Sequence, residues 1–395
     1  MEGGISFLNK LNDEREVIRM NDIAYDVTIV GGGPAGTTAA IHLARNGVKV
    51  CLVEKDAHPR YKVCGGGVLA RAVTLFPVPI ESVVEQPCHR VEMNFWGKKA
   101  GFTAQRPEPI IYMVMRADLD ALLMDEARKC GVVVLENTQG RDVALESGRV
   151  TLYTDREPIS SRFLIGADGV SSVVAQKGGW PDNRGAIPSM ECEVAVDPAT
   201  LERFSGCARF DLDHPRTGYS WVFPKKNHLS VGVLSMSHAG AGLREYLHAY
   251  LDGLEIKYAP PLKLRGAMIP VKPRPGAPAK GRVLLVGDAA GLAEPICAEG
   301  ITNALRSGLF AAKAIMEGAM DPERVVSSYL GEMESSVFRE LEIAGQHARV
   351  MYGNALLRNM LFRVKGESFC NRLIGVMTGE TGYEEMGGPM RQLFS

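Results

Sequence analysis

Residues 25–54 carry the pattern that most constrains this chain: an apolar run, a glycine-rich turn, a helix-like run, a second apolar run and an acid. The glycines are Gly31, Gly33 and Gly36, and Glu54 follows about 20 residues after the first of them, as in dinucleotide-binding fingerprints. Gly31 permits the tight turn, Gly33 lets the backbone approach a pyrophosphate, and Gly36 lets the helix pack closely on the strand. The pattern predicts a nucleotide-binding βαβ unit.

The expected elements of this unit are a buried strand over residues 27–30, a helix over 37–46 and a second strand over 48–53. A pyrophosphate would meet the N-terminus of the helix, where unpaired N–H groups and the helix dipole favour an anion. Glu54 would hold the two hydroxyls of a ribose and repel a 2′-phosphate. Three further residues of the unit are predicted to contact the cofactor: Pro34, Ala35 and Lys55.

Composition excludes several classes of protein. With 46% hydrophobic and 23% charged residues, the chain is typical of a globular protein, and its net charge of −1 gives no reason to expect a nucleic-acid partner. No apolar run approaches the ~18 residues that span a bilayer, and residues 1–22 form an extension without the apolar core of a secretory signal. Eight cysteines without a CxxC pair indicate reduced thiols in a cytoplasmic protein, with no metal site.

Cys64 is followed by three consecutive glycines, in the segment that comes after the predicted ribose-binding acid. Such a run is a loop whose backbone needs room, and its position predicts that it runs along the cofactor towards the reactive end. Cys64, Gly65 and Gly66 are therefore candidates for the redox centre. The alternative is a buried structural thiol in a flexible turn.

The predicted fold class is α/β: a discontinuous Rossmann-like nucleotide-binding domain, an inserted antiparallel sheet domain for the substrate, and a C-terminal helical segment. The inserted sheet is expected because residues 91–103 and 190–234 both show the alternation of strands. The predicted boundaries are an N-terminal extension at 1–22, nucleotide-binding pieces at 23–75, 111–182 and 266–330, sheet-domain pieces at 76–110 and 183–265, and a helical segment at 331–395.

Two further segments are predicted to complete the nucleotide site. In open α/β sheets ligands bind outside the carboxyl ends of the strands, so Asp288, at the end of the apolar run 283–286, should point into it. A helix over 301–316 would offer a second N-terminal dipole. Asp168 is read as a nucleotide contact, with a turn or N-cap role as the alternative. These segments and the amphipathic helix predicted over 116–129 add the contacts Arg116, Asp168, Gly169, Gly287, Asp288, Gly300 and Ile301.

Because Asp288 and the Cys64 loop supply contacts for the far half of a long cofactor, the nucleotide is predicted to be FAD and not NAD. The tail is helical in pattern from Glu332 until Gly366. Within it, residues 355–365 mix apolar and basic side chains, which fits either a helix on a membrane surface or one packed on the protein.

Four motifs together resemble the FAD-dependent geranylgeranyl reductase family, a branch of the para-hydroxybenzoate-hydroxylase-like flavoproteins. They are the glycine turn with Glu54, Tyr61-x-x-Cys64-Gly65-Gly66, Tyr219-x-Trp221-x-Phe223-Pro224 with Gly232, and Gly287-Asp288. The chain departs from the family pattern at three places. Pro59 lies two residues before Tyr61, where the family has its proline three before. The third motif has Leu234 two residues after Gly232, where the family has glycine, and the usual arginine downstream of residues 166–169 is Ala175.

The resemblance implies that FAD, once reduced, transfers a hydride from N5 to one carbon of an isoprenoid C=C bond, and that the other carbon is protonated. Cys64 is the implied catalytic residue, as a thiol close to the reacting carbons or to the isoalloxazine, and the proton comes either from it or from water. The implied substrate residues are Tyr61, Tyr219, Trp221, Phe223 and Pro224; the last four lie on one strand, where Tyr219, Trp221 and Phe223 share a face that fits either a cavity wall or a sheet core.

The chain shows only one complete glycine fingerprint, since 238–242 lacks the third glycine. Electrons are therefore expected from NAD(P)H that docks transiently or from a protein donor such as a ferredoxin. An FAD-dependent monooxygenase or halogenase acting on an aromatic or apolar substrate is the alternative, although halogenase-like chains carry Trp-x-Trp-x-Ile-Pro where this one has Tyr219 and Phe223. A Cys64–Cys297 redox pair and an FAD-binding protein without catalysis remain open.

Overall fold

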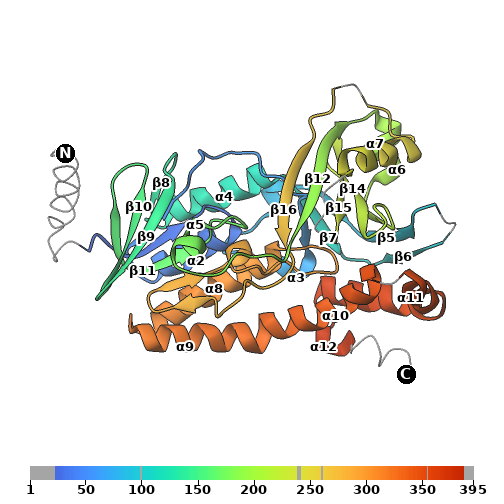
Figure 1. Ribbon diagram of the computed structural model, residues 1–395. Helices are drawn as coiled ribbons and strands as arrows, with labels where there is room; N and C mark the ends of the chain where they lie inside the picture. The colour runs from blue at the N-terminus through green and yellow to red at the C-terminus, as the bar shows by residue number, and fades with distance from the viewer. Residues whose placement is uncertain (1–22, 98–99, 238–241, 259–260, 354, 387–395) are drawn as a thin grey trace, which may run out of the picture.

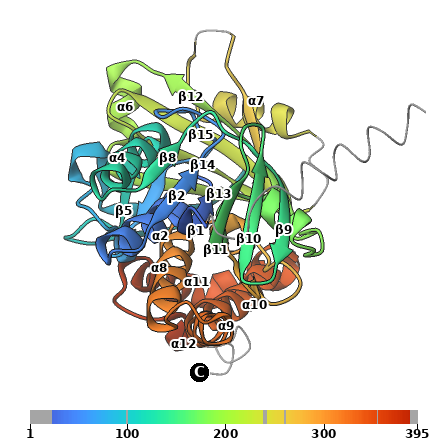
Figure 2. The same ribbon diagram turned by 90° about the vertical axis from the view of Figure 1, so that its left-hand side faces the viewer.

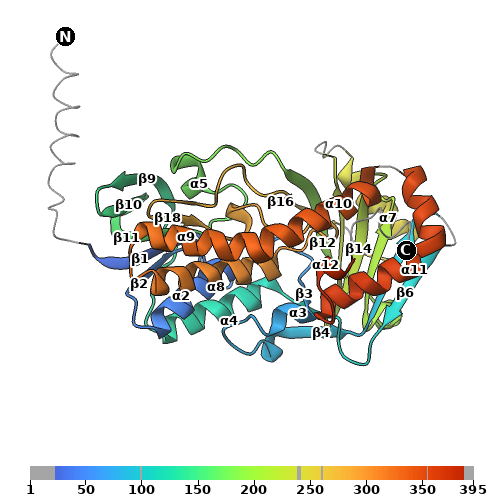
Figure 3. The same ribbon diagram turned by 90° about the horizontal axis from the view of Figure 1, so that it is seen from below.

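The computed structural model describes residues 23–97, 100–237, 242–258, 261–353 and 355–386, so the extension predicted at 1–22 and most of the 238–242 segment lie outside it. Two large sheets lie at opposite ends of the described part, and helices from the C-terminal part of the chain run beneath both (Figures 1 and 3). The α/β fold with an inserted sheet and a helical C-terminal part is thereby confirmed.

The first sheet is the nucleotide-binding one. Five of its strands are parallel, in the order β18-β11-β1-β2-β8, and the antiparallel β17, β10 and β9 extend it. Their bounds are β1 Tyr25–Val30, β2 Val50–Val53, β8 Val133–Leu135, β9 Gly140–Glu146, β10 Arg149–Thr154, β11 Ile159–Gly166, β17 Ala279–Lys280 and β18 Val283–Leu285. The central strands are buried on both faces, which explains their continuous apolar runs.

Two helices pack on one face of this sheet, α2 (Pro34–Arg45) and α8 (Ile301–Glu317) (Figure 2). A Cβ at Gly308 would lie 2.3 Å from the Ala35 carbonyl oxygen, so this glycine lets the two helices approach. The predicted helix at 116–129 is confirmed as α4, Arg116–Lys129. Helix α2 begins three residues before the predicted start because Pro34, which lacks an N–H, fits the first turn.

The second sheet joins both inserted pieces, as predicted. Its order is β16-β12-β15-β14-β13-β5-β6, and every pair is antiparallel except β13 with β5. That parallel pair corrects the expectation of a wholly antiparallel sheet, and it arises where the first inserted piece meets the second. The bounds are β5 Arg90–Phe95, β6 Gly101–Gln105, β12 Ala186–Ala195, β13 Cys207–Leu212, β14 Gly218–Pro224, β15 His228–Ser235 and β16 Arg265–Pro270.

The two faces of the second sheet pack against different helices. Val222 and its neighbours pack against α7 (Leu243–Gly253) with α6 (Pro198–Phe204) nearby, whereas the opposite face packs against the C-terminal helices. Strand β16 pairs with β12 in this sheet, although the predicted boundary at 265/266 assigns almost all of it to the FAD-binding domain. We therefore propose that the sheet domain extends to Pro270.

A small antiparallel sheet connects the cysteine loop to the rest of the protein. It contains β3 (Gly67–Leu69), β7 (Ile111–Val114) and β4 (Val84–Cys88). Around it and at the nucleotide site lie four short helices: α3 Ala70–Val73, η1 Glu81–Val83, α5 Val173–Lys177 and η2 Gly287–Ala289. Strand β3 begins at the residue after Gly66, so its pairing in this sheet fixes the position of the cysteine loop.

The C-terminal helices run from the first sheet to the second (Figure 3). They are α9 (Pro322–Glu332), the π-helical turn η3 (Met333–Phe338), α10 (Arg339–Gly353), α11 (Ala355–Thr378) and α12 (Tyr383–Met386). The prediction that the helical pattern ends at Gly366 is wrong, because α11 continues through it. A Cβ there would lie 2.2 Å from the Phe102 ring, so this glycine lets α11 pack on β6. None of the helices in the described ranges is long and apolar enough to cross a membrane.

Candidate functional site

The glycine turn between β1 and α2 is shaped by two contacts that exclude side chains. Gly31 has φ +110°, and a Cβ there would lie 2.2 Å from the Ala167 carbonyl oxygen. A Cβ at Gly36 would lie 2.0 Å from the Gly31 carbonyl oxygen. Gly33 differs, because a Cβ there would meet nothing closer than Arg116 Nη2 at 3.8 Å. Gly31 and Gly36 therefore serve the turn itself, whereas Gly33 leaves space at the N-terminus of α2.

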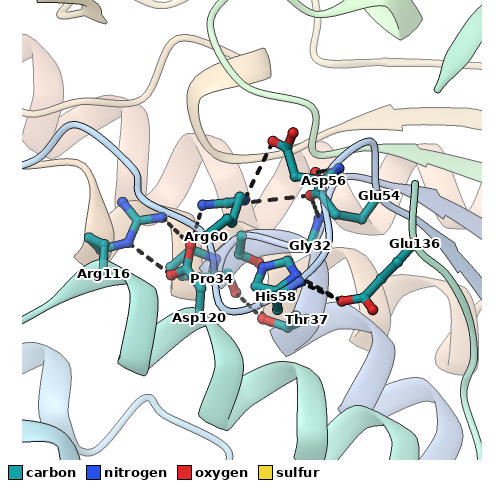
Figure 4. A network of polar contacts seen from close by, with 11 residues as sticks. Gly32, Pro34, Thr37, Glu54, Asp56, His58, Arg60, Arg116, Asp120 and Glu136 are labelled. Carbon is teal, nitrogen blue, oxygen red and sulfur yellow. Dashed lines mark hydrogen bonds and ion pairs between the residues drawn. The ribbon is translucent and has the colours of Figure 1, made fainter. Parts of the chain in front are cut away.

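Glu54 lies at the end of β2 and is 5% exposed (Figure 4). Its Oε2 accepts a hydrogen bond of 2.7 Å from the Gly32 N–H, and its Oε1 accepts one of 3.1 Å from the Asp56 N–H. These bonds hold the carboxylate against the glycine turn, as a ribose-binding acid requires. Lys55, also predicted to contact the cofactor, is exposed.

Two arginines share one buried carboxylate beside the turn (Figure 4). Arg116 Nε and Nη2 lie 2.8 and 2.9 Å from the Asp120 carboxylate oxygens, and Arg60 Nη1 lies 3.1 Å from Oδ2. Asp120 is fully buried. Arg60 also lies 4.0 Å from Glu54 Oε2 and 3.9 Å from Asp56 Oδ2, so carboxylates surround the two guanidinium groups. Both groups lie near the N-terminus of α2, where their N–H donors suit a pyrophosphate. Sequence reasoning missed Arg60 and Asp120, although Arg116 and Asp120 have the i,i+4 spacing of a helical ion pair.

His58 closes the other side of the turn. Its Nδ1 lies 3.2 Å from Glu136 Oε1, and its Nε2 is buried with no hydrogen-bond partner among the described residues. Its Cε1 would lie 3.2 Å from a Cβ on Gly32, so the ring borders the turn. A buried nitrogen without a partner at this place fits a hydrogen bond to a nucleotide.

Asp168 and Asp288, the two acids predicted to contact the nucleotide, follow the carboxyl ends of β11 and β18, and they differ in their contacts. Asp168 accepts hydrogen bonds from the Ser172 hydroxyl and, at 3.1 Å, from the Val174 N–H, so both its oxygens hold the turn before α5. This geometry favours the turn role over a nucleotide contact, and Gly169 adopts φ +80° in the same turn. Asp288 follows β18, and burial raises its pKa while Lys62 and Arg116 oppose the rise.

The start of α8 completes this end of the site. A Cβ at Gly300 would lie 3.3 Å from Asp288 Oδ1, so the structure brings these two predicted residues together, with Gly287 at φ +55° and Ile301 buried. Just before Gly300, Glu299 Oε1 accepts the Thr302 N–H at 2.9 Å, and its buried Oε2 has no hydrogen-bond partner in the described part of the chain. The residues present thus fit FAD at both ends of the site: cations and a helix N-terminus for phosphates, and partnerless polar atoms for hydroxyl or N–H groups.

The cysteine loop lies against the aromatic strand, which the sequence did not predict. A Cβ on Gly65 would lie 2.9 Å from both Trp221 Nε1 and Phe223 Cδ2. The neighbouring Cys64 Sγ accepts the Gly66 N–H at 3.4 Å. The expectation that Tyr219, Trp221 and Phe223 share one face of β14 is confirmed, since all three belong to one buried cluster. The structure therefore places a thiol next to an apolar aromatic wall.

The other two predicted substrate residues lie apart from that wall. Pro224 ends β14 and, by strand alternation, faces the side of Val222. Tyr61 is 38% exposed, and its ring lies under the Arg265 guanidinium at 4.4 Å. Its hydroxyl donates to Glu191 at 3.0 Å.

A small enclosed cavity lies between the second sheet and the C-terminal helices. Its volume of about 10 Å³ is roughly that needed for one water molecule. Tyr219 lines it and donates a hydrogen bond to the Cys297 carbonyl oxygen. Burial raises the pKa of the Cys297 thiol well above its ordinary value, with Glu294 and Glu299 adding to the rise. The other lining residues are Val91, Met93, Phe210, Leu212, Ile296, Tyr352 and Met377.

Glu191 on β12 gives the first testable prediction, because burial raises its pKa from 4.5 to about 7. An acid whose pKa is raised on folding contributes stability below pH 4.5, and this contribution is lost as pH rises through 7. At about 1.4 kcal/mol per pKa unit, the loss is about 3 kcal/mol. The free energy of unfolding of the wild type, relative to Glu191→Gln, should fall by that amount between about pH 5 and pH 8 in urea titrations of the apoprotein.

Glu157→Gln, a change at an exposed acid in the turn between β10 and β11, is the matched control and should leave the pH dependence unchanged. If the difference between the wild type and Glu191→Gln is the same at both pH values, Glu191 does not titrate in this window.

The fold and the site together define an FAD-dependent oxidoreductase. The family model described as an FAD binding domain matches residues 24–228. Digeranylgeranylglycerophospholipid reductase 2 of Methanothermobacter thermautotrophicus is 30% identical over 366 residues, covering 85% of this chain and 91% of that protein. The chain belongs to the FAD-dependent geranylgeranyl reductase family.

Two solved structures share the fold. A geranylgeranyl bacteriochlorophyll reductase-like protein of Thermoplasma acidophilum superposes with a TM-score of 0.74 at 23% identity, covering 90% of this chain and 91% of that one. The flavin-dependent brominase Bmp2 superposes with a TM-score of 0.71 at 18% identity, covering 90% and 93%. At these identities the likeness extends to the fold, and it spans both reductase-like and halogenating proteins.

Proposed function

We propose that the protein saturates C=C bonds of an isoprenoid, geranylgeranyl-type chain. The observation that carries this proposal is the contact between the Cys64 loop and the aromatic strand, because it brings the loop that carries the thiol beside aromatic rings whose carbon faces suit an apolar chain. An unactivated alkene has no polar handle, so its recognition needs such an apolar surface. The relative from Methanothermobacter, named as acting on a digeranylgeranylglycerophospholipid, supports a lipid-like substrate.

FAD, when bound and reduced, would supply the hydride equivalent that this reaction needs. The chain itself would do the rest. Gly33 and the N-terminus of α2 would hold the pyrophosphate with Arg60 and Arg116, and Glu54 the ribose. Asp288 and Gly300 would hold the far half of the cofactor.

Cys64 would donate the proton that completes the saturation at the second carbon. Its thiol lies in a half-buried loop whose glycine contacts Trp221 and Phe223. These rings would orient the chain and keep water from the reacting carbons. Tyr219, Trp221 and Phe223 would thus bind substrate without taking part in proton transfer.

The electron donor is proposed to be external, either NAD(P)H or a ferredoxin-like protein. The described residues contain one sheet with the parallel nucleotide-binding order, and its glycine turn is assigned to FAD. We propose a cytoplasmic protein that can touch a membrane surface, since α11 exposes Met360 (55%) and Val364 (74%) on one side.

The decisive test is flavin reoxidation without oxygen. Reduced holoenzyme should regain its oxidised flavin spectrum when mixed anaerobically with geranylgeranyl diphosphate or a digeranylgeranylglycerophospholipid, and the product should carry two more hydrogens per saturated bond. Mass spectrometry of the extracted lipid measures this directly.

A monooxygenase or halogenase of the same fold behaves differently. It would leave both isoprenoids unchanged under nitrogen and would consume oxygen, with halide for a halogenase, in the presence of an aromatic substrate. That result would replace the reductase proposal. A third outcome is that reduced flavin gives no saturated isoprenoid without oxygen and no modified aromatic substrate with oxygen. That outcome would indicate an FAD-binding protein without catalysis.

A further inference from the structure

The Cys64 loop is held by two buried ionisable side chains that no sequence motif singled out. Glu191, on β12, is 1% exposed, and Lys225, directly after β14, is fully buried. Both come from the inserted sheet, whereas the loop follows the nucleotide-binding strand β2. Burying a carboxylate and an ammonium is costly unless each finds partners, so the contacts that they make deserve a functional explanation.

Glu191 binds the loop on the amino side of Cys64. Its Oε1 accepts the backbone N–H of Cys64 at 2.8 Å and the hydroxyl of Tyr61 at 3.0 Å. Burial raises the pKa of this carboxyl to about 7, against the effect of the hydrogen bond from Cys64. Near pH 8 it is therefore an anion that touches the backbone of the cysteine.

Lys225 binds the loop on the carboxyl side of Cys64. Its Nζ donates to the Gly65 carbonyl oxygen at 2.7 Å and to the Val114 carbonyl oxygen on β7 at 2.9 Å. A Cβ on Gly66 would lie 2.7 Å from Nζ, so this glycine makes room for the ammonium. Burial lowers the pKa of Lys225, and Glu193, Cys64 and Glu191 oppose the fall.

Other charged and titratable groups face this pair from each neighbouring element. Glu193 lies two residues along β12 and pairs with His228 of β15 at 3.1 Å. Arg265 of β16 covers the Tyr61 ring. Cys88 of β4 acts electrostatically on Lys225, and Cys64 interacts electrostatically with Arg116 of α4.

We propose that Glu191 and Lys225 are positioning residues that clamp the Cys64 loop from both sides and set the charge around its thiol. The proposal rests on the proposed function in naming Cys64 as the proton donor. The two clamps bind the backbone on either side of Cys64, at its own N–H and at the Gly65 carbonyl oxygen, so together they fix where the thiol points relative to Trp221 and Phe223. A shift of about 1 Å in such a group costs about 100-fold in rate.

The charges act in opposite directions on the thiol. A carboxylate nearby disfavours the thiolate and keeps the proton on sulfur, as a donor needs. An ammonium nearby stabilises the thiolate left after donation. The two charges would thus have opposite effects on the proton affinity of the thiol, and removing one would change the thiolate fraction in the opposite direction to removing the other.

Alkylation of Cys64 by iodoacetamide tests the clamp without any isoprenoid, because the thiolate is the reactive form. The oxidised holoenzyme is treated near pH 8, and the modified cysteine is identified by peptide mapping. Glu191→Gln should speed modification of Cys64 about tenfold, and Lys225→Met should slow it about tenfold. Glu157→Gln, at an exposed acid in the turn between β10 and β11, should stay within about twofold of wild type.

Each result decides the proposal. Acceleration in both variants would mean that the loop has merely loosened, and rates within about twofold of wild type in both would mean that neither residue acts on the thiol; either overturns it. Glu191→Asp and Lys225→Arg keep the charges and serve if the first variants lose FAD or fail to fold. The alkylation rate of Cys64 in each of these variants should lie closer to the wild-type rate than it does in Glu191→Gln or Lys225→Met. If the charge-keeping and charge-removing variants change the rate equally, the proposal is also overturned.

Steady-state kinetics with a geranylgeranyl substrate provide the second readout. Both Glu191→Gln and Lys225→Met should lower kcat about 100-fold with KM within about threefold, because the apolar wall is intact. The kcat of the wild type should fall as pH drops through about 7, where Glu191 becomes protonated and its hydrogen bonds to the loop weaken. This acid limb should be absent in Glu191→Gln, and its persistence there would contradict the assignment. If the wild type reduces no isoprenoid but the alkylation rates shift in opposite directions, the proposed function fails and the clamp stands.

Discussion

Replacing Cys64 with alanine is expected to lower the rate of isoprenoid reduction by about 100-fold or more, with the FAD content unchanged. A side chain placed to donate a proton in the transition state typically contributes about 100- to 10,000-fold. Water entering the space left by sulfur would supply part of the lost function. The backbone contacts of the loop survive, because Glu191 binds the N–H of residue 64 and not its side chain.

The measurement is anaerobic single-turnover reoxidation of the reduced flavin, with FAD content taken from the absorbance ratio of the purified protein. Cys130→Ala, at the C-terminal end of α4, is the matched control for loss of a thiol and should leave the rate unchanged. Cys64→Ser, which keeps a far weaker acid in place, should fall nearer to alanine than to wild type. Full activity of Cys64→Ala would remove the thiol from the mechanism.

Replacing Gly33 with alanine is expected to abolish stable FAD binding without unfolding the protein. The backbone of Gly33, with φ −82° and ψ −178°, accepts alanine, and a methyl group there would lie 3.8 Å from its nearest neighbour, Arg116. That space at the N-terminus of α2 is where the pyrophosphate is expected. We therefore expect the Kd for FAD to rise by at least about 100-fold, with the melting temperature of the apoprotein within a few degrees of wild type.

Gly36→Ala provides the contrast. Its Cβ would lie 2.0 Å from the Gly31 carbonyl oxygen, a backbone atom that cannot move alone. This variant should be strongly destabilised before any cofactor is added. Gly331→Ala, at a site in α9 where a Cβ meets nothing within 4 Å, should affect neither property. Normal FAD content in Gly33→Ala, measured by titrating the apoprotein with FAD, would show that the cofactor does not use this turn as proposed.

The part of the fold that depends on local pattern could be predicted from the sequence. The βαβ unit around Gly31 and the helix at Arg116 were placed to within a few residues, because glycine geometry and apolar periodicity act over short distances. The prediction that the C-terminal helical pattern ends at Gly366 was wrong because it used the same short-range rules. A glycine inside a helical pattern reads as a stop, and only the ring of Phe102, more than 250 positions away, shows that it serves a close contact.

A site residue could be predicted only where the residues next to it in the sequence indicate its role. Glu54 and Asp288 end apolar runs, and this position directs them to the ligand edge of the sheet. Asp120 could have been found from its spacing to Arg116. Glu191 and Lys225 could not, since an isolated acid in a strand and a lysine after a proline are ordinary surface patterns.

The sequence by itself determined the glycine turn from Gly31 to Gly36 and predicted a dinucleotide on it, and its motifs identified the flavin family. The turn and the motifs can both be recognised by short-range rules, since a glycine turn or an acid after an apolar run is identified from residues close to it in the sequence. Only the tertiary structure decided which side chains meet Cys64. The loop and its clamps are about 130 to 160 residues apart in sequence. They are brought together because the inserted sheet packs over the loop that leaves the nucleotide-binding sheet, and burial there turns two ordinary charged residues into groups that act on one thiol.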